Sequence, residues 1–142
     1  MKADDKAITI DANVILRYLL KDNSVLSPKA KQTIDAMDDG KITLLCDPVT
    51  LAEVVWVMTS FYNMPPNVIE SHLTPLVGAP GFAVANKEHY LRALKLFASS
   101  IPHFGDACAC AAALETADGR LLSFDRKLSR VPGIRRLEKA VC

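Results

Sequence analysis

The stretch AITIDANVILRYLLK, residues 7–21, joins a short apolar run to an amphipathic segment and indicates the kind of fold that the chain adopts. Residues 7–10 are β-type and end at Asp11, which predicts a short strand. Residues 12–21 then repeat apolar side chains at helical spacing, which predicts a helix. One face of this helix carries Val14, Ile15, Tyr18 and Leu19.

The same alternation of strand and helix continues along the chain. Further strands are predicted at residues 42–46, 82–84 and 121–124, with a last edge strand at 134–137. Helices are predicted for residues 27–40 and 49–62, after Pro65-Pro66, after Asn86, for residues 106–116, and briefly up to Arg130. Strands that alternate with helices form a parallel sheet covered on both faces. We therefore expect an α/β protein, a three-layer α/β/α sandwich with a central, mainly parallel sheet of four or five strands.

Prolines and short polar residues mark where the helices begin and end. Ser27 is predicted to cap the second helix, with Pro28 in its first turn. Asp47 and Pro48 form the same pair before the third helix. Pro75 has no amide hydrogen, so we expect it to kink or end the fourth helix.

Of the 142 residues, 50% are hydrophobic and 23% are charged, so disorder is excluded and a single domain over residues 1–142 is expected. No apolar run approaches the roughly 20 residues that cross a bilayer, and the N-terminus has no apolar signal core. We expect a cytoplasmic protein without a membrane partner. The net charge of +1 conceals an asymmetry: residues 1–119 carry 10 basic and 14 acidic side chains, and residues 120–142 carry 7 and 2.

The four cysteines, Cys46, Cys108, Cys110 and Cys142, form no Cys-x-x-Cys pair. No spacing between His and Cys is typical of a zinc site. We expect small buried thiols in a reducing compartment.

Two predicted strands lead directly into an aspartate, Asp11 and Asp125. Both carboxylates are therefore expected at the carboxyl edge of the sheet, where parallel α/β folds bind their ligands. Each residue also has a simpler alternative, because an aspartate after a strand is a common N-cap for the next helix.

Two further acidic residues lie in predicted helices. Glu53 belongs to the most apolar stretch of the chain, residues 51–58, where an ionised side chain needs a cation or hydrogen bonds unless it lies on the outer face. Trp56, in the same stretch, is expected in the core. Asp106 opens the alanine-rich helix, where it either joins the other carboxylates or only complements the helix dipole.

Four carboxylates at one sheet edge would repel each other in a partly dry pocket unless a cation were bound. Oxygen ligands without nearby Cys or His favour Mg²⁺ or Mn²⁺ over Zn²⁺. Such an ion can clamp a phosphodiester, ionise a water and stabilise the leaving oxygen. The pattern therefore indicates metal-dependent hydrolysis of phosphodiester bonds.

Four short motifs in this order resemble the PIN-domain nucleases, in particular the toxin ribonucleases of VapBC-type toxin–antitoxin pairs. The resemblance covers most of the chain, from about residue 8 to residue 137. The motifs are Ile10-Asp11-Ala12-Asn13-Val14, Leu51-Ala52-Glu53-Val54, Phe104-Gly105-Asp106-Ala107 and Leu122-Ser123-Phe124-Asp125-Arg126-Lys127-Leu128, followed by the turn Val131-Pro132-Gly133.

The resemblance implies a catalytic, metal-binding pocket made of Asp11, Glu53, Asp106 and Asp125. It implies polar residues that orient these carboxylates, namely Asn13, Thr50 and Ser123. Many relatives carry a further acidic residue where this chain has His103, so the pocket is expected to hold one or two ions of Mg²⁺ or Mn²⁺. His103 itself either contacts phosphate or is an exposed loop residue.

The implied activity is an endoribonuclease that leaves a 3′-hydroxyl and a 5′-phosphate, the toxin of a type II toxin–antitoxin system. The implied partners are RNA, a cognate antitoxin protein and a second copy in a homodimer. The basic end is expected to bind the RNA backbone through Arg126, Lys127 and Arg130, with Arg135 and Arg136 nearby, unless these are ordinary solvated charges. The alternative function is a catalytically inactive PIN-like domain that binds RNA or protein.

Overall fold

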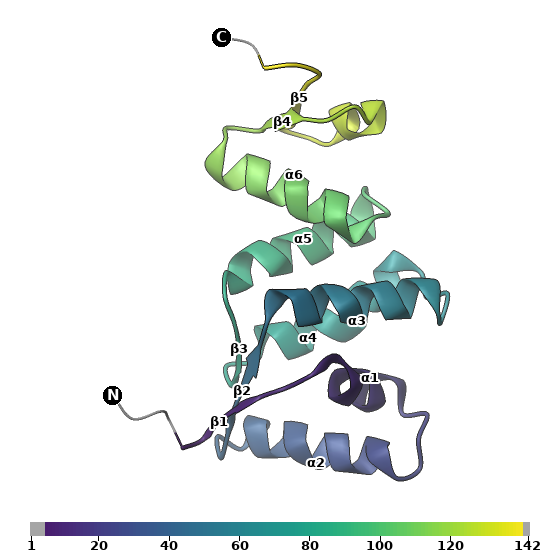
Figure 1. Ribbon diagram of the computed structural model, residues 1–142, viewed down its shortest axis with the longest axis vertical. Helices are drawn as coiled ribbons and strands as arrows, with labels where there is room; N and C mark the ends of the chain where they lie inside the picture. The colour runs from purple at the N-terminus through teal and green to yellow at the C-terminus, as the bar shows by residue number, and fades with distance from the viewer. Residues whose placement is uncertain (1–4, 141–142) are drawn as a thin grey trace.

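Helices and strands alternate along the chain in the predicted order (Figure 1). The computed structural model describes residues 5–140, so Cys142 and most of residues 1–6, for which a prediction about a signal segment was made, lie outside the described residues. The helices are α1 (Ala12–Leu20), α2 (Leu26–Asp38), α3 (Pro48–Ser60), α4 (Pro66–Gly78), α5 (Lys87–Ser99), α6 (Phe104–Thr116) and the 3₁₀ helix η1 (Arg126–Arg130). The strands are β1 (Ala7–Thr9), β2 (Thr43–Cys46), β3 (Phe82–Val84), β4 (Arg120–Leu122) and β5 (Arg135–Leu137).

All strand pairs are parallel, and they form two sheets. The first has the order β1-β2-β3, and the second pairs β4 with β5. The predicted three-layer α/β/α class and the parallel direction are confirmed. The five strands are divided between two sheets, however, because β4 does not pair with β1 within residues 5–140.

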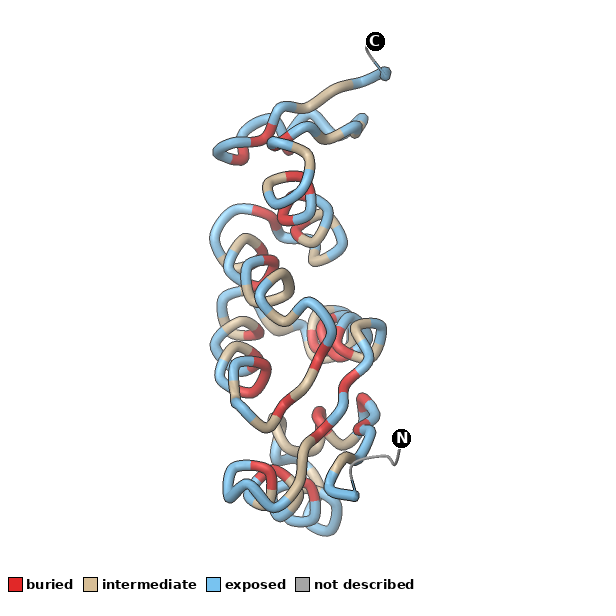
Figure 2. The backbone as a smooth tube through the Cα atoms, turned by 90° about the vertical axis from the view of Figure 1, so that its left-hand side faces the viewer, coloured by how far each residue is buried: buried red, intermediate tan, exposed pale blue. Residues whose placement is uncertain are grey.

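The two sheets lie toward opposite ends of an elongated molecule (Figure 1). The strand β1 lies near α1 and α2, whereas β4 and β5 lie beyond α6 at the C-terminal end. A view turned by 90° shows that the molecule is elongated from this side as well (Figure 2). Helices α3 to α6 therefore lie between the first sheet and the second.

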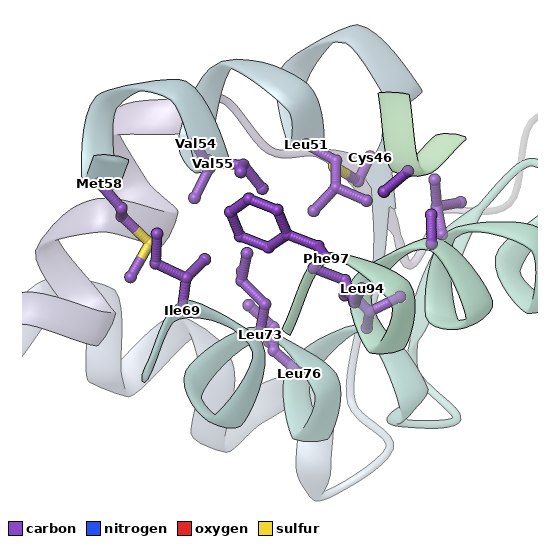
Figure 3. Close-up of a cluster of buried hydrophobic side chains, with 14 of the residues drawn as sticks. Cys46, Leu51, Val54, Val55, Met58, Ile69, Leu73, Leu76, Leu94 and Phe97 are labelled. Carbon is purple, nitrogen blue, oxygen red and sulfur yellow. The ribbon is translucent and has the colours of Figure 1, made fainter. Parts of the chain in front are cut away.

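The main core lies between the first sheet and helices α3, α4 and α5 (Figure 3). Register places Ile8, Leu44 and Phe82 in one row, of which Leu44 and Phe82 are fully buried. The helices contribute the fully buried Leu73 and the nearly buried Phe97. Burying one such side chain stabilises the fold by about 1.5–3 kcal/mol, so this core accounts for most of the apolar burial.

Helix α6 reaches the rest of the molecule through α5. Three of its side chains are fully buried, namely Ala107, Cys110 and Ala111. Because these side chains are small, the two helices can pack close together. At the start of α6, Phe104 meets Phe97 edge to face with ring centroids 5.7 Å apart. The C-terminal sheet therefore depends on α6 for its position.

Of the predicted helix boundaries, the Asp47 cap is confirmed and the Ser27 cap is wrong, and of the two outcomes expected at Pro75 the end of the helix does not occur. Asp47 caps α3, accepting a hydrogen bond from the Val49 amide at 2.8 Å. Ser27 does not cap α2, because the Asn23 side chain accepts from the amide of Leu26 at 2.8 Å and the helix begins earlier. Pro75 does not end α4, which continues to Gly78. Within residues 5–140, no helix is both long and apolar enough to span a bilayer.

Candidate functional site

Asp11 lies just beyond β1, where the buried Ile10 leads the chain into α1. Its Oδ1 accepts a hydrogen bond from the Val14 amide at 3.1 Å, so Asp11 is the N-cap of α1. The side chain is nevertheless exposed to solvent. The alternative that Asp11 caps the next helix therefore holds in this structure. The cap uses Oδ1, so Oδ2 of Asp11 stays open to a ligand.

Glu53 and Trp56 point away from the core of α3. The buried face of this helix carries Leu51, Val54 and Met58, so residues one turn apart on the other side face outward. Glu53 is exposed, and Trp56 is 66% exposed. The expectation that Trp56 belongs to the core is therefore wrong. For Glu53 the outer-face alternative holds, so its carboxylate is exposed to solvent and needs no compensating cation.

Asp106 and Asp125 line one cavity of about 220 Å³. Asp106 is half-buried in the first turn of α6, whereas Asp125 is exposed and caps η1. The Asp125 Oδ1 accepts from the Lys127 amide at 3.0 Å. The same cavity is lined by His103, so this loop residue lies beside both carboxylates.

The exposed helix η1 supplies the predicted RNA-binding side chains, Arg126, Lys127 and Arg130. Lys127 and Arg130 line the cavity together with the two aspartates. Basic groups beside carboxylates would attract a phosphate that the carboxylates alone would repel. The cavity thus combines ligands for a cation with groups that suit an anion.

Arg136 has a structural role that sequence reasoning did not find. Its Nη1 donates to the Ser123 carbonyl at 2.8 Å, and its Nε donates to Ser129 Oγ at 2.8 Å. Only 14% of its side chain is exposed, and it also pairs with Glu138 at 3.0 Å. Through these contacts Arg136 holds the turn before Asp125. No sequence signal separates it from the exposed Arg135, because only the pairing of β4 with β5 brings it to Ser123.

The three polar residues predicted to orient the carboxylates differ in position. Ser123 Oγ accepts from the Asp125 amide at 3.1 Å, which shapes the turn that carries this carboxylate. Asn13 is exposed beside Asp11, and Thr50 is half-buried in the first turn of α3. Among the described residues, no hydrogen bond joins Asn13 or Thr50 to any of the four carboxylates.

The structure therefore brings two of the four carboxylates together and leaves Asp11 and Glu53 apart from them. Within residues 5–140, no three His, Cys, Asp or Glu side chains lie close enough to hold a metal ion together. Two carboxylates nevertheless fit the requirements of Mg²⁺, which proteins often bind through one or two carboxylates plus substrate phosphates and water. Asp106 and Asp125 are thus the residues that fit a divalent ion in this conformation.

The described cysteines are free thiols, and two of them are buried as predicted, Cys46 and Cys110. Burial raises the pKa of Cys46 to about 11, helped by the nearby charge of Asp47. Burial likewise raises the pKa of the half-buried Cys108 to about 11. These thiols are protonated at neutral pH and are poor metal ligands, consistent with a site made of oxygen donors.

Parallel strands with helices packed on them define an α/β protein. The family model that matches the chain is that of the PIN domain, and it matches residues 8–134. The chain therefore belongs to the PIN-domain family, whose members are commonly nucleases that depend on divalent metal ions. No curated protein and no solved structure matches the chain.

Proposed function

We propose that this protein is a metal-dependent endoribonuclease, with its chemistry at Asp11, Glu53, Asp106 and Asp125. The observation that carries the proposal is the cavity in which Asp106 and Asp125 lie beside Lys127 and Arg130 in a PIN-domain chain. Metal ligands and phosphate-binding groups occur together there. The proposal treats the whole chain as one nuclease domain acting on RNA in the cytoplasm.

In this proposal Asp106 and Asp125 bind the divalent ion, either Mg²⁺ or Mn²⁺. The bound ion would supply a Lewis acid that lowers the pKa of a water and neutralises charge on the phosphate. Lys127 and Arg130 bind the phosphate groups on either side of the reacting one. Ser123 and Arg136 hold the turn that presents Asp125, so they position this carboxylate without touching the substrate.

RNA cleavage by purified protein tests the proposal. Cleavage is expected with Mg²⁺ or Mn²⁺ and is expected to stop when EDTA removes the metal. Asp106→Asn and Asp125→Asn keep the size of each side chain but remove the charge, so both should abolish cleavage. The products should end in 3′-hydroxyl and 5′-phosphate groups.

Asp38→Asn is the matched control, because Asp38 is an exposed aspartate on α2 outside the cavity. This variant should cleave as the wild type does. Equal cleavage by wild type and Asp125→Asn would refute the assigned chemistry. Absence of cleavage, with retained RNA binding, would favour the catalytically inactive alternative.

We further propose that the protein is the toxin of a type II pair and that an antitoxin covers the groove between α3 and the α5–α6 junction. This groove has a volume of about 780 Å³ and is lined by Val49 and Trp56, of which Val49 is 76% exposed. Exposed apolar side chains that line a groove are typical of surfaces that bind a protein. Induction of the wild type in bacterial cells should arrest growth, whereas induction of Asp125→Asn should not.

A further inference from the structure

The strand β1 has one unpaired edge, and so does β4. Thr43 donates to the Lys6 carbonyl and Ile10 donates to the Leu45 carbonyl, each at 2.9 Å. Because successive residues of a strand face opposite sides, the backbone groups of Ala7 and Thr9 face away from β2. Among the described residues no strand pairs with them.

The edge of β4 has the same character. Ser123 donates to the Leu137 carbonyl at 2.9 Å, and Arg135 donates to the Gly119 carbonyl at 2.7 Å. The backbone groups of Arg120 and Leu122 therefore face away from β5. The Arg120 amide already donates to the Ala117 carbonyl at 3.0 Å, so the Leu122 amide and the two carbonyls form the open edge. A two-stranded parallel sheet with an open edge is unusual, because parallel sheets are normally larger and covered.

Neither open edge carries the features that normally prevent pairing with another chain, which are proline, bulges and rows of charge. Ala7 and Thr9 are uncharged, and Arg120 is the single charged residue of β4. Both strands also expose an apolar side chain, with Ile8 at 49% and Leu122 at 59% exposure. The two edges are thus suited to accept a strand.

We propose that two copies of this chain exchange these edges, so that β4 of each copy pairs in parallel with β1 of the other. The result is a two-fold dimer with two equal five-stranded sheets, each in the order β3-β2-β1 from one copy and β4-β5 from the other. A reciprocal exchange closes and leaves no open strand for a third copy.

The occupant of the β1 edge is a second copy because the chain's own β4 is held at the far end of the molecule (Figures 1 and 2). Phe97 and Phe104 hold α6 on α5, and His89 meets Glu115 at 2.9 Å between the same two helices. Ile101, in the connection, is 2% exposed and anchors it in the core.

Charge favours the same pairing. Residues 1–119 have a net charge of 10 − 14 = −4, and residues 120–142 have a net charge of 7 − 2 = +5. In the exchanged dimer the basic C-terminal end of one copy lies against the acidic body of the other. Complementary charge of this kind speeds association and fixes the orientation of partners.

The exchange also brings a third carboxylate to the proposed active site, and in this respect the inference rests on the proposed function. Backbone alternation places Thr9 opposite one of the residues of β4 that bond to β5, and the register that overlaps the two strands fully pairs Thr9 with Leu121 of the second copy and Asp11 with its Ser123. Asp11 then lies beside the turn that carries Asp125. Each active site would combine Asp11 from one copy with Asp106 and Asp125 from the other.

Strand-edge variants test the exchange by mass measurement in solution, independently of catalysis. The wild type should have twice the monomer mass of 15.5 kDa. Thr9→Pro and Leu122→Pro each remove an amide that faces the open edge and not the neighbouring strand, so each should be mostly monomeric. An equimolar mixture of the two should recover dimer, because one of the two pairings stays intact in a mixed pair.

Far-UV circular dichroism of both proline variants, and Thr9→Val as a matched control that stays dimeric, exclude unfolding as the cause. A monomeric wild type, dimeric proline variants, or a mixture that stays monomeric would each overturn the proposal.

Catalysis adds a second measurement. Asp11→Asn and Asp125→Asn should each be inactive, and their equimolar mixture should recover about a quarter of wild-type cleavage, because half of the dimers then hold one complete site. A dimer that cleaves no RNA would refute the proposed function and leave the exchange standing. Metal-dependent cleavage by a monomer would refute the exchange and leave the function standing.

Discussion

The N-terminal and C-terminal regions of this protein differ in how they are stabilised. Residues 5–101 contain all of the largest fully buried side chains, such as Phe82 and Leu73. The C-terminal unit, made of α6, β4, η1 and β5, buries mainly small residues such as Ala107 and Ala111. The first region is stabilised by its own core, whereas the second depends on α5 and on whatever pairs with β4.

The largest expected effect is a loss of core packing in the first region. Leu73→Ala should lower the free energy of unfolding by about 2–5 kcal/mol, because it removes a fully buried side chain and leaves a cavity. Leu122→Ala, at a 59% exposed position of the second region, should change it by less than about 0.5 kcal/mol at concentrations that favour monomer. Urea unfolding measures the free energy of unfolding of both variants. Equal losses of stability would contradict the claim that the first region is stabilised by its own core and the second is not.

The second effect concerns the backbone junction between β4 and β5. Gly119 has φ of +81°, and a Cβ there would collide with the Gly133 carbonyl oxygen. Gly119→Ala should therefore cost about 1–3 kcal/mol and loosen the C-terminal unit. Limited proteolysis should cut the variant first after residue 103. Gly78→Ala is the control, since nothing lies within 4 Å of its added Cβ, and proteolysis of that variant should match the wild type.

The third effect concerns Arg136 and the turn before Asp125. Arg136→Ala removes the donor to the Ser123 carbonyl and should weaken Mn²⁺ binding about 10–100-fold, as loss of a supporting group beside a metal ligand does. Arg135→Ala removes an exposed side chain of the same strand and should change Mn²⁺ affinity little. Titration of Mn²⁺ against thermal stability separates the two. Equal affinities in both variants would contradict a positioning role for Arg136.

Metal binding should stabilise the protein by a smaller amount. At a Mn²⁺ or Mg²⁺ concentration of ten times Kd, one site adds about 1.4 kcal/mol, which raises Tm by roughly 3–6 °C. Asp125→Asn should lose this shift. Asp11→Asn decides whether the first region contributes to the same site: if the shift is unchanged in this variant, the metal is bound by the C-terminal unit alone.

The last effect is absent at neutral pH, develops only above pH 9, and is shared by both regions. Burial raises the pKa of Cys46 and of Cys108 from 9.0 to about 11. Between these values the unfolded chain has lost protons that the native protein keeps, so the free energy of unfolding should fall as pH rises from 9 to 11 and stay flat below 9. At neutral pH the two thiols should react with iodoacetamide about 100-fold more slowly than a free cysteine. Rapid alkylation of the folded protein would contradict this burial.

The spacing of apolar, capping and proline residues predicted the helices and strands well. It predicted a helix cap wrongly where two side chains compete for the same turn. Asp47 is a cap in both the prediction and the structure, because its side chain reaches an amide two residues away. At α2 the Asn23 side chain takes the role expected of Ser27, since both can bond to the same turn. The sequence contains both caps, and local pattern alone does not rank them.

The candidate site was predictable in residue identity and not in arrangement. The positions of Asp11 and Asp125 after strands followed from the pattern, as did the basic helix beside Asp125. The outward orientation of Glu53 and Trp56 did not, because α3 is apolar around most of its circumference and its buried face depends on which helices pack against it. The role of Arg136 depended on the pairing of β4 with β5, which brings its guanidinium to the Ser123 carbonyl, 13 positions earlier in the chain.

The sequence by itself determined the order and type of the elements, the carboxylates that follow the strands and the charge difference between the two ends. These depend on interactions between residues a few positions apart. Only the tertiary structure decided that the five parallel strands form two sheets and that Asp106 and Asp125 line one cavity while Asp11 and Glu53 lie elsewhere. Strands of three or four residues have too few local contacts to select a neighbour, so the packing of α6 on α5 determines where β4 lies.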